Sequence, residues 1–187
     1  MLDFLFKKDP VRSQAETLYA AIAEQALAPE FFAVAGAPDT PEGRFDMIAL
    51  HMFLAVDRLL RDAPADDLLA QRLQEVFFER LDGALREMGV GDLSVGRKIR
   101  GLAEAFYGRY AAYRDALAAG DGALGAAIAR NVLGLADATK GALLADYAMA
   151  ARGVLDSAPV DELAAAFAAL GSLSRSRFRG GVDGRGA

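Results

Sequence analysis

The amino-acid sequence predicts an all-α fold, a single compact bundle of about six to seven helices with a disordered C-terminal tail. Apolar residues make up 53% of the 187 residues and charged residues 25%, a balance typical of globular chains rather than disordered ones. Alanine is abundant while Val, Ile and Thr are sparse, which favours helices over strands. Apolar residues also recur at spacings of three and four. A chain of this length is expected to form one domain.

The first half of the chain is expected to hold three long helices. A flexible segment at 1–11 precedes the first helix, for which Ser13 is a plausible N-cap, and Pro29 opens a short helical turn. Prolines and glycines predict a loop at 35–43. The helix predicted at 67–88 carries the broadest apolar face, so we expect it to lie at the centre of the bundle. The three long helices are predicted at 12–28, 44–61 and 67–88.

The second half continues the same helical pattern. Gly89 is expected to end one helix and Ser94 to cap the next, which Gly120 ends. The chain then becomes rich in Ser, Arg and Gly, a composition typical of disorder. The helical domain is therefore expected to cover 12–173, with a disordered tail at 174–187. The four helices predicted in this half are 95–119, 122–134, 137–156 and 161–171.

Composition excludes several kinds of chemistry. The chain has no cysteine and a single histidine, His51, which excludes disulfides, thiolate metal sites and sites with several histidines. Only a hard-cation site made mainly of carboxylates would remain. His51 could act as a general base, but a packed histidine is the preferred interpretation because no Ser or Cys constellation is evident around it. We therefore expect no metal and no cofactor.

The charge and hydropathy of the chain limit its possible binding partners. The net charge is −5, and the body of the chain is more acidic still because the last thirteen residues carry four arginines against one aspartate. An acidic body disfavours DNA as the main partner. No uncharged apolar run approaches the length of a membrane span. The first eight residues lack the features of a secretory signal, so the protein is expected in the cytoplasm.

The helix at 95–119 has two distinct faces. One is an apolar stripe that is expected to face the core. The other is a ridge of small residues, Gly101, Ala105, Gly108 and Ala112. Two interior glycines cost about 1 kcal/mol each relative to alanine, and a small-residue ridge permits close approach of a second helix. That helix could belong to a partner or to the same domain, and both interpretations stay open. The apolar stripe consists of Val95, Ile99, Leu102, Phe106, Tyr110, Tyr113 and Leu117.

Charged residues of this region have two interpretations. Five bases of the same helix could form a solvated face, or a basic patch for anionic lipid, ribosomal RNA or an acidic partner. Asp39 could pair with Arg44, and Arg86 with Asp92, either to pin the loops or to form a recognition edge. The five bases are Arg97, Lys98, Arg100, Arg109 and Arg114.

Three motifs make the chain resemble the ubiquinol–cytochrome c chaperone family. They are Pro38-Asp-Thr-x-x-Gly-Arg-Phe-Asp46, continuing to Leu50-His-x-Phe-Leu54; Leu85-Arg-Glu-Met-Gly-Val-Gly-Asp-Leu-x-Val95; and Phe106-Tyr-Gly-Arg-x-x-Ala-Tyr113. Matching stretches run from about Leu18 to Leu117. The chain departs from similar sequences at Leu27 and Phe32, where a basic residue and a tyrosine are more frequent.

The resemblance implies a non-enzymatic, all-helical chaperone of bacterial type that binds newly made cytochrome b at the inner face of the inner membrane. A ribosome or a small partner protein are further partners of such chaperones, and peripheral membrane contact is compatible with them. The alternatives are an enzyme centred on His51 or carboxylates, and a membrane- or ribosome-docking scaffold that uses the arginines of the tail. We expect the client-binding residues to be Asp39, Arg44, Arg86, Asp92, Lys98, Gly101, Phe106, Tyr107, Gly108, Arg109 and Tyr113.

Overall fold

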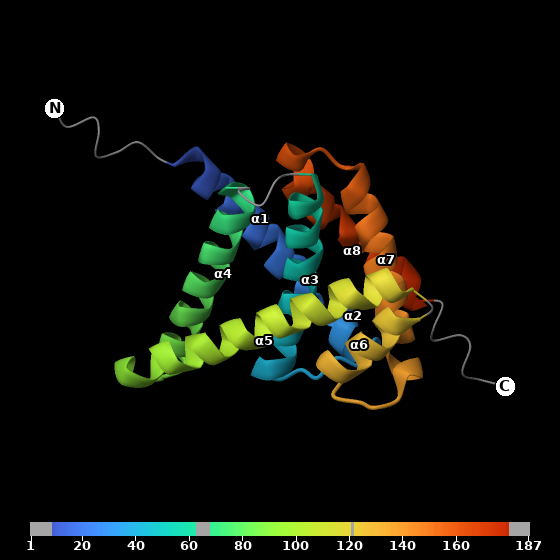
Figure 1. The fold of residues 1–187 in the computed structure, drawn as a ribbon, viewed down its shortest axis with the longest axis horizontal. Helices are drawn as coiled ribbons and strands as arrows, with labels where there is room; N and C mark the ends of the chain where they lie inside the picture. Colours follow the sequence, from blue (N-terminus) through green and yellow to red (C-terminus); the bar gives the residue numbers. More distant parts are fainter. Residues whose placement is uncertain (1–8, 63–67, 121, 180–187) are drawn as a thin grey trace.

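The computed structural model describes residues 9–62, 68–120 and 122–179. Within these residues all regular secondary structure is helical, which confirms the predicted fold class (Figure 1). The α-helices are α1 (Pro10–Ala26), α2 (Pro29–Ala33), α3 (Pro41–Asp62), α4 (Leu68–Glu87), α5 (Asp92–Ala119), α6 (Ala123–Asn131), α7 (Ala142–Ser157) and α8 (Leu163–Arg179), with short 3₁₀ helices η2 (Ala138–Gly141) and η3 (Val160–Glu162).

The central helix is α3, not α4 as the width of the apolar stripe predicted. Every residue from Met47 to Leu59 except Ile48 is buried, and α3 packs against α1, α4, α5 and α7. In contrast, α4 buries one face, formed by Leu69, Ala70, Leu73, Val76 and Phe77. The sequence prediction was wrong because α3 contains polar residues that look solvent-facing but are buried.

Those polar residues are paired with distant parts of the chain. The Arg58 side chain donates to the backbone carbonyls of Leu155 (3.0 Å) and Ala158 (3.1 Å) at the end of α7. Asp57 pairs with Arg61 at 3.0 Å and with Arg152 at 3.4 Å. Pairing of this kind offsets the cost of burying charged groups.

The first helix begins two residues before its predicted start. The Asp9 carboxylate accepts hydrogen bonds from the backbone N–H groups of Val11 and Arg12, at 3.1 and 3.2 Å, and Pro10 occupies the first helical position. Asp9 is therefore the N-cap, and Ser13 lies inside the helix. Residues 1–8 of the predicted flexible segment lie outside the described residues.

The last helix runs past the predicted domain boundary at 173. Within the segment predicted as a disordered tail, residues 174–179 are helical, and Ser174 and Phe178 are 0% and 1% exposed. The buried positions of α8 recur at spacings of three and four and face α1 and α7. The helical domain therefore extends to Arg179, and residues 180–187 lie outside the described residues. The buried positions in question are Leu163, Phe167, Leu170, Ser174 and Phe178.

A buried polar network connects the two ends of the chain. The His51 ring contacts the Met47 carbonyl through Nδ1 and the Tyr147 hydroxyl through Nε2, both at 2.8 Å. Because a carbonyl only accepts, Nδ1 carries the proton and Nε2 accepts from Tyr147. Gln25 donates to the same hydroxyl at 3.1 Å and to Ser174 Oγ at 3.4 Å. His51 is thus a packed core histidine, as the preferred interpretation stated.

Candidate functional site

The first motif builds the entry to α3. Thr40 Oγ1 accepts from the Gly43 backbone N–H at 3.1 Å, which caps the helix. A Cβ on Gly43 would lie 2.0 Å from the Pro38 carbonyl oxygen, so only glycine fits there. The preceding loop is held by Asp39, whose carboxylate pairs with Arg44 at 2.7 Å. The predicted Asp39–Arg44 pair is therefore present, on the surface.

This pair borders a cleft of about 430 Å³. The Arg44 guanidinium lies 5.9 Å from the centre of the Phe32 ring, within the range of a cation–π contact. The sequence analysis did not assign Leu27 and Phe32 to a site, although it singled both out as departures from similar sequences. The cleft is lined by Leu27, Pro29, Phe32, Ala33, Ala37, Asp39 and Arg44.

The first and third motifs meet in the half-buried interior. Arg109 of α5 pairs with Asp46 of α3 at 2.7 Å, with side-chain exposures of 21% and 14%. The Arg109 guanidinium also lies 5.6 Å from the centre of the Phe45 ring. Burial raises the pKa of Asp46 to about 6, against the opposing effect of Arg109. Arg109 was expected beside the small-residue ridge, and its partner Asp46 was not predicted.

Two of the predicted client-binding residues lie in the core. Phe106 and Tyr113 are 1% and 0% exposed. Phe106 packs edge-on against Phe77, with ring centres 5.3 Å apart, and Tyr113 contacts Phe53 at the same separation. Phe106 and Tyr113 were predicted to bind the client, but the structure places both side chains in the core, where they are not accessible to a partner.

The small-residue ridge of α5 faces outward. A Cβ placed on Gly101 or Gly108 would meet no other atom within 4 Å. Tyr107 beside them is 51% exposed, and its hydroxyl donates to Gln74 Oε1 at 3.0 Å. Lys98 is also exposed. Gly101 and Gly108 therefore pack against no other described element, whereas Ala105 of the same ridge is half-buried against the core.

The second motif forms the turn between α4 and α5. Gly89 has a φ of +81°, and the backbone N–H groups of Gly89 and Val90 donate to the carbonyls of Arg86 and Leu85, at 2.9 and 3.0 Å. This is a glycine-dependent helix end. Arg86 pairs with both Asp82 and Asp92, so the predicted Arg86–Asp92 pair holds the turn. The next helix starts at Asp92 with Gly91 as N-cap, so Ser94 is not its cap.

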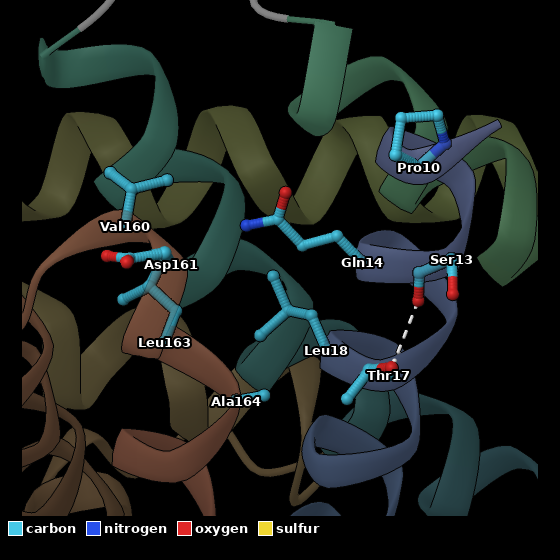
Figure 2. Close-up of a pocket in the computed structure, with 9 residues that line it drawn as sticks. All are labelled: Pro10, Ser13, Gln14, Thr17, Leu18, Val160, Asp161, Leu163 and Ala164. Atoms are coloured by element: carbon cyan, nitrogen blue, oxygen red, sulfur yellow. Dashed lines mark hydrogen bonds between the residues drawn. The ribbon is translucent and has the colours of Figure 1, made fainter.

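A second cleft, of about 440 Å³, lies between α1 and the start of α8. Figure 2 shows α1 contributing one wall and η3 with the first turn of α8 the other. None of the predicted client-binding residues lies in it. Its lining residues are Pro10, Ser13, Gln14, Thr17, Leu18, Val160, Asp161, Leu163 and Ala164.

The three motifs therefore occupy one connected region around α3, α5 and the turn before α5. A family model described as ubiquinol-cytochrome C chaperone matches residues 33–169, which contain all three. The chain belongs to the ubiquinol–cytochrome c chaperone family. That assignment confirms the resemblance found from the motifs. The family's description identifies its members as chaperones.

Individual relatives agree with the family. The chain is 24% identical over 160 residues to ubiquinol-cytochrome-c reductase complex assembly factor 1 of Xenopus laevis, covering 84% of this chain and 80% of the relative. It is similar to the crystal structure of the Cbp3 homolog from Brucella abortus, with a TM-score of 0.72 and 36% identity over 89% of this chain and 94% of the other.

Within the described residues, no helix is both long enough and apolar enough to cross a membrane. The same residues contain no group of three or more His, Asp or Glu side chains placed to hold a metal ion.

Proposed function

We propose that this protein holds newly synthesised cytochrome b during assembly of the ubiquinol–cytochrome c reductase (bc1) complex, and that it does so without catalysis. The observation that carries the proposal is membership of the chaperone family over residues 33–169. The engagement of the single imidazole, His51, in the core supports a non-catalytic role.

A holder of cytochrome b must shield apolar membrane helices from water. The outward ridge of α5 suits this task because a helix backbone can approach closely wherever side chains are absent. Gly101 and Gly108 each cost the isolated helix about 1 kcal/mol relative to alanine, and no described residue packs against them. We therefore place the client against this ridge, with Tyr107 and Lys98 beside it.

The other predicted residues take supporting or rim positions. Phe106 and Tyr113 fix α5 from the core side, and Arg109 orients it through Asp46. Asp39 and Arg44 form the polar side of the 430 Å³ cleft, whose apolar side includes Leu27 and Phe32. An apolar wall with a charged rim fits a segment that is held and later released.

The ridge is tested with a matched pair of leucine variants. Gly108→Leu on α5 and Gly153→Leu on α7 both add a side chain at an exposed helical position with nothing within 4 Å. Each is co-expressed with tagged cytochrome b, and the amount that co-purifies is measured. We expect Gly108→Leu to lose the client and Gly153→Leu to keep it, with unchanged helix content in both.

Equal recovery of cytochrome b by the two variants would refute the placement on α5. Failure of the unmodified protein to co-purify with cytochrome b would refute the client itself. A stoichiometric divalent metal in the purified protein, or turnover of a substrate, would instead support an enzyme.

We also propose that the protein acts at the cytoplasmic face of the inner membrane, where cytochrome b is inserted. A ribosome or a small partner protein would be an additional partner there. Crosslinking in cells with and without cytochrome b expression, followed by mass spectrometry, identifies which of them is adjacent to the client-binding surface.

A further inference from the structure

The turn between α4 and α5 carries the most exposed apolar side chains of the described chain. Leu93 is 100% exposed and Met88 is 62% exposed. Figure 1 shows α4 and α5 meeting in a corner at one end of the molecule, away from α6, α7 and α8. We call residues 88–100 the α4–α5 corner.

The fold does not account for these two side chains. The turn is closed by Gly89 and by the Arg86–Asp92 pair, and Val95 is the buried apolar side chain of the corner, at 1% exposure. Leu93 and Met88 therefore leave apolar surface in water without stabilising the described domain.

Three bases follow Leu93 within two turns of α5. Arg97, Lys98 and Arg100 are all exposed, and none forms an ion pair with another described residue. The acidic groups nearby are Asp82 and Asp92, both bound to Arg86, and the exposed Glu87 and Glu104, which form no ion pair with the three bases. The bases are thus available to an external anion.

We propose that the α4–α5 corner docks onto an anionic membrane surface. The helical rise of about 1.5 Å per residue puts Arg97 roughly 6 Å and Arg100 roughly 10 Å behind Leu93 along α5. Apolar side chains of interfacial helices enter the headgroup region by about 5–10 Å. When Leu93 and Met88 enter to that depth, the three bases lie at the level of the lipid phosphates.

An anionic bilayer fits these observations better than an RNA. Binding to phosphates alone needs bases but no exposed leucine, so the exposure of Leu93 beside the bases is explained by a bilayer and not by an RNA. Juxtaposed apolar and basic residues are the pattern that membrane surfaces recognise.

This docking is independent of the client. It would orient α5 so that Gly101, about 12 Å further along the helix than Leu93, lies close to the bilayer. A client segment leaving the membrane would then reach the ridge over a short path.

The test is flotation of the purified full-length protein with vesicles of phosphatidylcholine alone or of phosphatidylcholine mixed with phosphatidylglycerol. We expect binding only to the mixed vesicles, weakened by salt. Since each base near an anionic surface contributes about 1 kcal/mol, the Arg97→Gln/Lys98→Gln variant should bind roughly 25-fold more weakly. Leu93→Ser should also weaken binding.

Matched controls remove the same groups elsewhere. Arg130→Gln/Lys140→Gln removes two exposed bases near α6 and η2, and Leu135→Ser removes an apolar side chain that is 43% exposed. Both should bind as the unmodified protein does. Equal binding of vesicles by the corner and control variants would overturn the proposal, and so would the absence of any vesicle binding. If the corner variants instead lose co-pelleting with ribosomes, the corner binds the ribosome and the membrane proposal is wrong.

Discussion

The Arg109 guanidinium lies 2.7 Å from the Asp46 carboxylate and thereby connects the middle of α5 to the second turn of α3. The two residues come from different sequence motifs, and the pair is partly withdrawn from water. The position of the small-residue ridge relative to the Asp39–Arg44 cleft therefore depends on this contact and on the packing of Phe106 in the core.

Arg109→Leu should destabilise the protein because it leaves the Asp46 carboxylate partly buried without a counter-charge. The expected loss in free energy of unfolding is about 3 kcal/mol, measured by urea denaturation. Arg114→Leu is the control, since Arg114 is 64% exposed and 3.9 Å from Asp115, and it should change stability by less than about 0.5 kcal/mol. Similar effects of the two variants would contradict the importance of the Arg109–Asp46 pair.

Two glycine-to-alanine variants should act in opposite directions. Gly43→Ala places a Cβ 2.0 Å from the Pro38 carbonyl oxygen, so we expect a loss of about 2 kcal/mol as the loop shifts. Gly101→Ala adds a Cβ in open space within α5 and should stabilise by about 1 kcal/mol. Thermal denaturation of both variants measures the difference. A destabilising Gly101→Ala would show that the ridge is already covered.

Protonation of His51 should make stability depend on pH. Burial lowers the pKa of His51 from 6.5 to about 4. Between these values the unfolded chain binds more protons than the folded one, so the His51 contribution to stability is present above pH 6.5 and is lost as pH falls towards 4. The loss over this window is roughly 3 kcal/mol.

His51→Gln isolates this effect because glutamine does not titrate. The advantage of the unmodified protein over His51→Gln in free energy of unfolding should shrink by roughly 3 kcal/mol from pH 7 to pH 4. Chemical denaturation at several pH values gives both curves. A constant difference across the window would contradict a buried, neutral His51.

The end of α8 should contribute to the core. Phe178 is 1% exposed and packs against Phe31 and Tyr147, with ring centres 5.4 and 5.9 Å away. Phe178→Ala should therefore cost about 3–4 kcal/mol in free energy of unfolding, measured by thermal denaturation. Comparable melting of the unmodified protein and a chain ending at Leu173 would show that residues 174–179 are dispensable.

The sequence predicted those parts of the fold that depend on local signals. Helix periodicity placed α3, α4 and α5 within a few residues of their observed bounds, and the positive φ of Gly89 and Gly120 agrees with their predicted role as helix ends. The Asp39–Arg44 and Arg86–Asp92 pairs were also predictable, because each joins residues only five or six positions apart.

The remaining features depend on partners that are distant in the sequence. The burial of Arg58 could not be predicted because its acceptors, the carbonyls of Leu155 and Ala158, lie about a hundred residues away. Ser174 and Phe178 looked like part of a tail for the same reason. Composition describes each residue alone, whereas burial depends on which helices surround it.

In the candidate site, too, some features could be predicted from the sequence and others could not. The sequence identified both faces of α5, but it could not decide whether the glycine ridge points outward, since a closely packed helix and a vacant surface require the same small residues. It also assigned Phe106 both to the core stripe and to the client-binding residues, and the structure places this side chain in the core. The contribution of Leu27 and Phe32 to the cleft required the position of α2.

Gln25 and Ser174, joined by a hydrogen bond in the core, are 149 positions apart. During translation, the N-terminal helices leave the ribosome long before α8 has been made, so the core around His51 and Tyr147 stays open until α8 is available. Completion of this core therefore depends on a helix that is made long after the elements it covers.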